Sequence, residues 1–482
     1  MVWRLVLAVW FAVGLSIDIY VVARDERKTG GNKKGSPRYR PYLPSYLLPM
    51  YIGILLLMLL PQKRYETLLD MLYRFLGIFL HIGVYYAVLM IAIPYLRRYF
   101  SSRVCAVLWI IPNYLYVFAI LPLHLGKPWM VISLPDIPGT LLAGIWLAGF
   151  AVVLGWKGIA HLRFRKWLLE SSEPVTDATM LRLWGEAQVN ARLVKPDAQS
   201  HRFIPMMQSE RINTPLAVGL MRLTTVMVMP KRSYSEEELT MIFQHEVIHI
   251  GREDSWTKFF LVFCTAMCWF NPLMWMAVRR CSEDVELSCD ETVLLDAEDA
   301  KKKQYAQLLL KTTGDDRGFT TCLSATGRAM RYRLGQVMDA PKRQLGLVVI
   351  MCAAILLFAS YGIFPLSYYC GTATDVIFQG TESEKLKFVH VRMDQGEPVS
   401  ALETETMLYE YLSQIQARRL SGSYGEEKSR HKLSIQYDNP GYFFVLLYDQ
   451  RMEVFRYQVG VTEEYYLSEP VDWDYVQTLL SQ

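Results

Sequence analysis

The chain has 482 residues, 52% of them apolar and 20% charged, a composition that favours a membrane protein over a soluble one. Its net charge of +4 is modest, so the distribution of charge is more informative than the sum, and we expect no direct nucleic-acid partner. Among eight cysteines there is no C-x-x-C pair, and Cys370 alone falls in the C-terminal region, which excludes an internal disulfide there.

The first part of the chain predicts about five membrane spans within residues 1–156. Residues 2–23 are apolar and lack a small-residue cleavage site, so we interpret them as a retained span rather than a signal peptide. Later apolar segments have the length that crosses a bilayer, at 42–60, 76–96, 104–123 and 138–156. The lipid bilayer is therefore an expected partner.

The basic loop at 24–41 predicts the orientation of these spans. Cytoplasmic loops carry an excess of Lys and Arg, so this loop should lie inside and the N-terminus outside. By parity, the loop at 97–103 and the segment after residue 157 also fall inside, and both are basic. Lys63 and Arg64, in the first outside loop, fit the rule less well.

Residues 235–251 predict a helix with a metal-binding motif. Ser235 and Glu238 have the spacing of a capping box at its start. His245 and His249 are four residues apart, so one helix face can direct both imidazoles at one metal ion. Glu246 lies beside them as a general base for the attacking water. The alternative is an amphipathic helix that contains two histidines by chance.

Residues 283–291 predict a second helix segment with an acidic face. Glu283, Glu286 and Asp290 share that face at spacings of three and four. One could supply the third protein ligand, and another could orient a ligating histidine. A solvated helix face is the alternative that the spacing leaves open.

The segment 256–278 is apolar enough to cross a membrane, yet a crossing would separate Glu286 from His245 and His249. We therefore predict a membrane-dipping helical hairpin that turns at Asn271-Pro272. Before the motif helix, residues 225–230 predict a short strand. It could offer a sheet edge to a substrate or serve only in packing, and the sequence does not choose between these.

Three motifs in order resemble the antirepressor membrane metallopeptidases of the Bla/Mec type. They read His245-Glu246-x-x-His249-x-x-Arg252-x-Asp254, Trp269-Phe270-Asn271-Pro272-x-x-Trp275 and Glu286-x-x-Cys289-Asp290, and the resemblance is good over residues 140–345. It implies a Zn²⁺ peptidase of the bacterial plasma membrane in which Glu286 is the third ligand. Asp290 would orient a ligating histidine. Arg252 and Asp254 match the family motif, and two roles stay open for them: a structural ion pair at the helix end, or a part in catalysis.

The C-terminal part departs from the family members that sense penicillins. Residues 345–366 contain the last predicted span, with Lys342 and Arg343 at its inner end, and 367–482 should then be a small outside α+β domain. Ser429 and Lys432 match an S-x-x-K element by letters only, since no S-D-N element follows. We therefore predict no penicillin-binding site, and the extracellular ligand stays unknown.

These patterns predict a multi-pass α-helical membrane protein with a cytoplasmic α+β zinc metallopeptidase domain at 157–343 and an extracellular α+β domain. The resemblance implies a signal transducer that cleaves a cytoplasmic transcriptional repressor or itself, with a homodimer as one option. Two alternatives remain. One is a housekeeping membrane zinc peptidase of the CAAX-processing or heat-shock type. The other is a signalling scaffold with an idle peptidase site.

Overall fold

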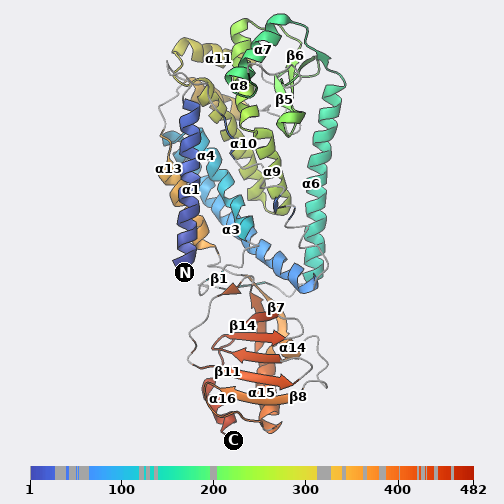
Figure 1. Cartoon of the computed structure of the whole chain (residues 1–482), viewed down its shortest axis with the longest axis vertical. Helices are drawn as coiled ribbons and strands as arrows, with labels where there is room; N and C mark the ends of the chain where they lie inside the picture. Colours follow the sequence, from blue (N-terminus) through green and yellow to red (C-terminus); the bar gives the residue numbers. More distant parts are fainter. Residues whose placement is uncertain are drawn as a thin grey trace.

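The computed structural model is an elongated molecule with a helical bundle in the middle and an α/β region at each end (Figure 1). It describes residues 2–27, 39–42, 50–51, 53, 64–118, 124–125, 131–134, 139–195, 203–311, 327–338, 344–361, 366–378, 387–400, 402–420, 423–424, 429, 431–438, 443–456 and 461–481.

Three helices in the described part are long and apolar enough to cross a membrane: α1 (Val2–Arg27), α3 (Arg64–Tyr99) and α6 (Gly139–Leu169). A shorter apolar helix, α13 (Leu347–Ser360), packs along α1. Many of their aliphatic side chains are exposed, such as Ile91, which is 74% exposed. Such surfaces are expected where helices face lipid.

Two of the predicted spans are not seen as single long helices. The segment 42–60 lies almost entirely outside the described residues. The segment 104–123 is not one continuous helix: α4 (Ser102–Ile110) leads into the 3₁₀ helix η1 (Ile111–Tyr114) and then α5 (Leu115–Phe118). Pro112 lies at the change of helix type, where its missing N–H and fixed φ disfavour a continuous α-helix.

Helices α9 (Asp254–Met267) and α10 (Pro272–Val293) form a hairpin, with the Asn271 side chain capping α10 through the Leu273 N–H at 3.0 Å. The turn lies where the sequence indicates it. Gly149 of α6 leaves room for Trp269, which lies in this turn. A Cβ at position 149 would lie 2.1 Å from the Trp269 ring. Trp146 of α6 also donates to the Met267 carbonyl at 2.8 Å. The hairpin therefore packs inside the helical bundle.

The region at one end of the bundle contains a four-stranded sheet in the order β3-β4-β6-β5, and we call it the four-stranded region. Its strands are β3 (Glu173–Pro174), β4 (Met206–Ser209), β5 (Leu216–Val218) and β6 (Val226–Pro230). Its helices are α7 (Ala178–Asn190), α8 (Glu236–Gly251), α11 (Asp299–Lys311) and α12 (Gly327–Met338), with a 3₁₀ turn η3 (Arg222–Thr224). Strand β6 is paired on both sides, so it is a packing strand rather than the sheet edge that the sequence left open.

The other end carries an eight-stranded sheet in the order β2-β7-β9-β14-β13-β12-β11-β8, and we call it the eight-stranded region. Its strands are β2 (Ile132–Ser133), β7 (Leu366–Thr372), β8 (Lys387–Met393), β9 (Gln416–Leu420), β11 (Leu433–Asp438), β12 (Phe443–Leu447), β13 (Arg451–Arg456) and β14 (Val461–Leu467). Helices α14 (Ala373–Phe378), α15 (Leu402–Gln414) and α16 (Trp473–Leu480) contribute to the same hydrophobic core.

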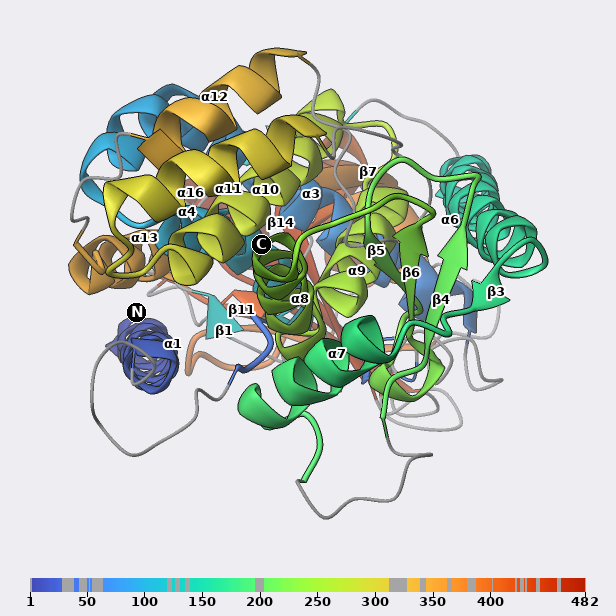
Figure 2. The same ribbon diagram turned by 90° about the horizontal axis from the view of Figure 1, so that it is seen from above.

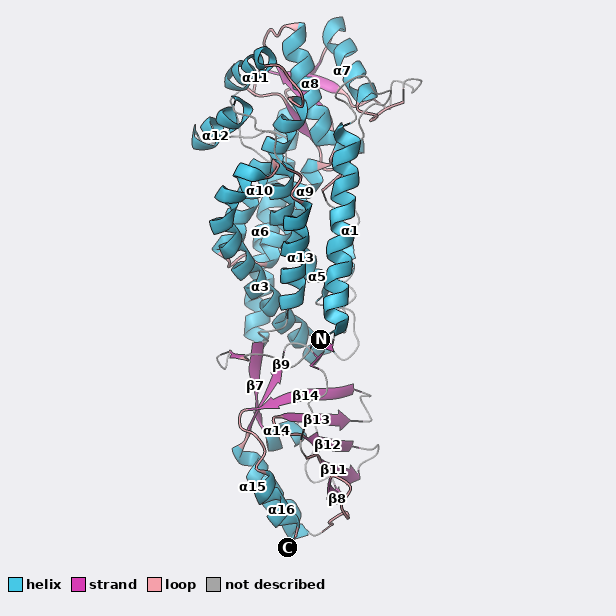
Figure 3. Ribbon diagram, turned by 90° about the vertical axis from the view of Figure 1, so that its left-hand side faces the viewer, coloured by secondary structure: helices cyan, strands magenta, loops and turns pink. Residues whose placement is uncertain are grey.

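The eight-stranded region begins earlier in the chain than the sequence predicts. Its edge strand β2 comes from the loop between α5 and α6 and pairs in parallel with β7. In the same loop, β1 (His124–Leu125) pairs with β10 (Ser423–Tyr424). The boundaries 1–156 and 367–482 therefore divide a region that the backbone hydrogen bonds hold together. The two sheets themselves lie at opposite ends of the bundle (Figures 1 and 3).

Candidate metal centre

Helix α8 carries both motif histidines and lies over the α9–α10 hairpin (Figure 2). The predicted capping box is present: Glu238 N–H donates to Ser235 Oγ at 3.1 Å, and Ser235 N–H donates to Glu238 Oε2 at 2.9 Å. One helical turn separates His245 and His249, and their Nε2 atoms lie 3.0 Å apart. The helix thus presents two nitrogen lone pairs to one point in space.

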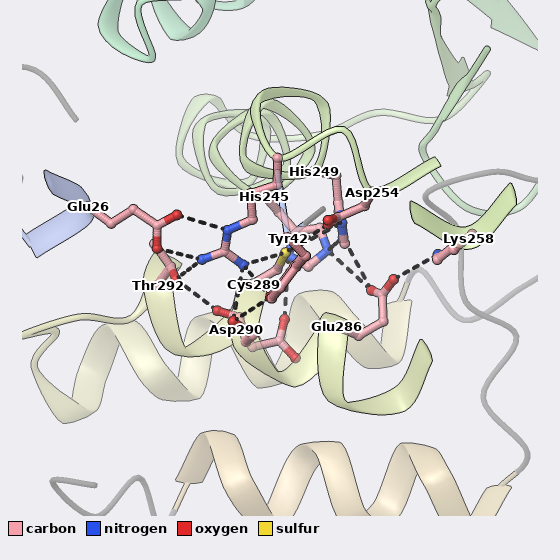
Figure 4. Close-up of polar contacts among 12 residues, drawn as sticks. Glu26, Tyr42, His245, His249, Asp254, Lys258, Glu286, Cys289, Asp290 and Thr292 are labelled. Carbon is pink, nitrogen blue, oxygen red and sulfur yellow. Dashed lines mark hydrogen bonds and ion pairs between the residues drawn. The ribbon is translucent and has the colours of Figure 1, made fainter. Parts of the chain in front are cut away.

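Glu286 of α10 reaches the same point from below (Figure 4). Its Oε2 lies 3.6 Å from His245 Nε2 and 3.4 Å from His249 Nε2. Ligand atoms about 2.0–2.2 Å from a tetrahedral zinc ion lie roughly 3.3 Å from one another. The three donor atoms therefore have the separations that one tetrahedral ion requires, with a fourth position left over.

The outer ring nitrogens of both histidines have polar partners. His249 Nδ1 lies 2.6 Å from Asp254 Oδ2, and both side chains are fully buried. His245 Nδ1 lies 2.9 Å from the Tyr305 hydroxyl, which donates to Asp290 Oδ1 at 2.7 Å. Histidines that bind metals in proteins usually donate this second N–H to a carboxylate or a similar acceptor, which fixes the ring. The polar partners of His245 and His249 are therefore of the kind found around metal sites, in addition to the three converging donor atoms.

Asp290 lies near His245, its Oδ1 3.4 Å from Nδ1, but Tyr305 makes the shorter contact. Arg333 of α12 in turn donates to Asp290 Oδ1 at 2.7 Å. The sequence analysis missed Tyr305 and Arg333, which lie on α11 and α12. A helical spacing rule gives no signal for residues on separate helices.

The charge of Glu286 is stabilised from two sides. Lys258 Nζ lies 3.4 Å from its Oε1, and His249 faces its Oε2. Burial alone would raise the pKa of Glu286, but in the metal-free site a protonated His249 and Lys258 lower it well below the ordinary value. Glu286 is therefore a carboxylate, the form that binds a cation.

The predicted ion pair between Arg252 and Asp254 is wrong. Arg252 is fully buried and donates to both carboxylate oxygens of Glu26 in α1, at 3.1 and 2.9 Å. Between the two residues, Glu253 has a φ of +53° and reverses the chain into α9. Because of this reversal, Asp254 turns back to His249 (Figure 4). Arg252 instead faces Glu26 of α1.

A second group of three donors consists of His249, Asp254 and Cys289. It would use His249 Nδ1, the nitrogen that Asp254 already contacts. Burial raises the pKa of the Cys289 thiol, which favours its neutral form and disfavours metal binding. The group of His245, His249 and Glu286 is therefore the better candidate. Glu246 is buried next to His245 on α8, and its role is a matter of proposal.

Residues 125–334 match the family model described as BlaR1 peptidase M56. These residues are therefore similar to the peptidase domain of that family. A curated relative, "Regulatory protein BlaR1" of Bacillus licheniformis, is 24% identical over 189 residues, which are 39% of this chain and 30% of that protein. The match includes every residue of the metal centre described above. The family match supports the Bla/Mec resemblance and a membrane protein of the metallopeptidase type. Of the eight-stranded sheet it includes only the edge strand β2, and it ends before β7.

Proposed function

We propose that the chain is an integral-membrane zinc endopeptidase that transmits a signal across the membrane. The observation that carries this proposal is the convergence of His245, His249 and Glu286 on one point, with the outer nitrogens of both histidines held by buried partners. Tetrahedral sites with two histidines and one carboxylate, and one open position, are typical of zinc hydrolases.

In this proposal the bound Zn²⁺ supplies a Lewis acid that polarises the peptide carbonyl and lowers the pKa of the attacking water. Glu246 accepts the proton of that water and returns it to the leaving amine. Asp254 holds the ring of His249, and Tyr305 together with Asp290 holds the ring of His245. With a metal bound, both histidines would be neutral, and these partners would leave Nε2 as the nitrogen that holds the ion.

The proposed topology puts the peptidase domain in the cytoplasm and the eight-stranded region outside the bacterial cell. The basic loop at 24–41 supports it through the positive-inside rule. The position of the two sheets at opposite ends of a bundle with three long apolar helices supports it independently (Figure 1). The hairpin of α9 and α10 would enter the membrane region from the peptidase side.

For a substrate we propose a cytoplasmic transcriptional repressor, or the chain itself. The name of the relative, a regulatory protein, supports a regulatory role over that of a housekeeping peptidase. A regulatory output could also come from a scaffold whose site is idle. The decisive experiment must therefore separate cleavage from signalling.

Glu246→Gln provides that experiment. Purified variant protein should retain zinc and the melting temperature of the wild type, because Glu246 is not among the converging donors. Cleavage fragments in cells, and the transcriptional response, should both fall by at least about 100-fold, as expected for loss of a general base. If cleavage is lost while the transcriptional response persists, proteolysis is not the output and the scaffold alternative holds.

A further inference from the structure

A cavity whose lining includes no residue of the metal centre lies where α3, α4, α10 and α12 meet. Its volume is about 670 Å³, within the range of small-molecule sites. Apolar side chains form one wall, among them Met90, Ile93 and Trp109. Three arginines line the rest, and we call this cavity the arginine pocket after Arg97, Arg98 and Arg280.

The pocket contains cationic groups that lack full compensation. The side chain of Arg97 is 9% exposed, and its Nη2 has no hydrogen-bond partner among the described residues. Its Nε is held by Asp284 at 2.8 Å, and Nη2 lies 3.8 Å from Glu283. Arg280 shares Glu283, at 2.9 Å. A buried donor without a partner indicates a group that the protein alone does not supply.

Arg98 adds an uncompensated charge at the mouth of the pocket. Its described contact is with the ring of Tyr95, at 5.9 Å, and no carboxylate in the described part lies within ion-pair distance of it. Arg280 is half exposed on the other side of the mouth. The pocket therefore presents a net positive charge to an incoming ligand.

Along the axis of the bundle, the pocket lies at the level expected for the membrane–water interface. Along the outer face of α3, Val84, Val88 and Ile91 are 59%, 62% and 74% exposed, and the exposed Tyr95 and Tyr99 follow them. A change from aliphatic residues to tyrosine and arginine marks the level of lipid headgroups. Met276 of α10 also lines the pocket and is 52% exposed, so part of the pocket wall is exposed apolar surface.

We propose that the arginine pocket binds the phosphate of an anionic phospholipid, with an acyl chain lying along the aliphatic face of α3. Arginines at the headgroup level bind anionic lipids, because charge attraction and hydrogen bonding act together. A choline headgroup would bring an ammonium group against the same arginines and is disfavoured.

Native mass spectrometry of the full-length protein in detergent tests this proposal, with added phosphatidylglycerol or phosphatidylcholine of identical acyl chains. Wild type should retain phosphatidylglycerol preferentially. Arg98→Gln and Arg280→Gln should each weaken retention about fivefold, and the double variant roughly thirtyfold. Arg279→Gln is the matched control, because Arg279 is an exposed neighbour on α10 that does not line the pocket.

Equal retention of phosphatidylglycerol by the double variant and by Arg279→Gln would overturn the site, as would equal affinity for phosphatidylcholine. Inorganic phosphate forms a separate arm. If it displaces phosphatidylglycerol at millimolar concentration, the pocket is a site for soluble phosphate and the lipid assignment is wrong. Melting temperatures verify that the variants are folded, and Arg97 is left unchanged because it holds Asp284.

Discussion

The two ends of the molecule each contain a histidine–aspartate pair with nearly the same geometry. In the peptidase domain, His249 Nδ1 lies 2.6 Å from Asp254 Oδ2, and in the eight-stranded region His431 Nδ1 lies 2.8 Å from Asp394 Oδ2. The first pair is 0% exposed on both sides, whereas the second is 29% and 45% exposed. Distance alone therefore does not distinguish a functional pair from a surface contact.

What distinguishes the pairs is the other nitrogen of each imidazole. His249 Nε2 faces His245 and Glu286, so Asp254 acts on a group of converging donors. His431 belongs to no such group: in the part of the chain that the structure describes, candidate metal groups occur only around His249. Burial and convergence together make the first pair a positioning device, whereas the second pair is a surface contact beside the ends of the paired strands β8 and β11.

The largest expected effect comes from removing the carboxylate at each end. Asp254→Asn should lower metal affinity roughly 10–100-fold, because a neutral amide oxygen replaces the charged acceptor that fixes the ring of His249. The matched change Asp394→Asn should leave metal affinity unchanged. Competition with a chromophoric chelator measures both. Equal metal affinities in the two variants would mean that the His249–Asp254 pair positions a metal ligand no better than the exposed His431–Asp394 pair does.

The packing of the hairpin into the bundle predicts a steric effect. Gly149→Val should destabilise the protein by about 1–3 kcal/mol, because the new side chain meets the Trp269 ring that holds the hairpin turn. Gly144→Val, on the same helix with nothing within 4 Å, is the control. Thermal unfolding in detergent compares them. A Gly149 variant as stable as the Gly144 variant would mean that the turn lies elsewhere.

A smaller effect should appear with pH in the eight-stranded region. Burial raises the pKa of Asp394 and the hydrogen bond from His431 lowers it, with a net lowering. A carboxyl with a lowered folded-state pKa adds stability above its unfolded pKa and loses it as pH falls through the folded value. Because the pair is exposed, the gain should stay below about 1 kcal/mol. Asp394→Asn should reduce the loss of unfolding free energy at acidic pH. An unchanged loss would mean that other carboxyl groups cause it.

Sequence reasoning located the parts of the metal centre that follow from spacing within one helix. His245 and His249 are four apart on α8, and the capping box of Ser235 sets where that helix begins. Glu286 followed from the family resemblance. The direction of Asp254 did not follow, because it depends on the left-handed conformation of Glu253, a residue type that rarely adopts it.

Long-range partners explain the remaining differences. Arg252 pairs with Glu26, which is 226 residues away, and Tyr305 reaches His245 from another helix. Strand β2 joins a sheet whose other strands lie in the C-terminal third of the chain. Local patterns of hydrophobicity and charge carry no information about such pairings, which packing of the whole chain decides.

The central claim is the identity of the metal ligands, and zinc X-ray absorption spectroscopy of the purified protein tests it most directly. The account predicts nitrogen and oxygen ligands alone, at about 2.0–2.2 Å, including two imidazoles. These would be His245 and His249, with Glu286 as an oxygen ligand. A sulfur ligand at about 2.3 Å would contradict the account, because it would place Cys289 in the coordination sphere and select the donor group of His249, Asp254 and Cys289.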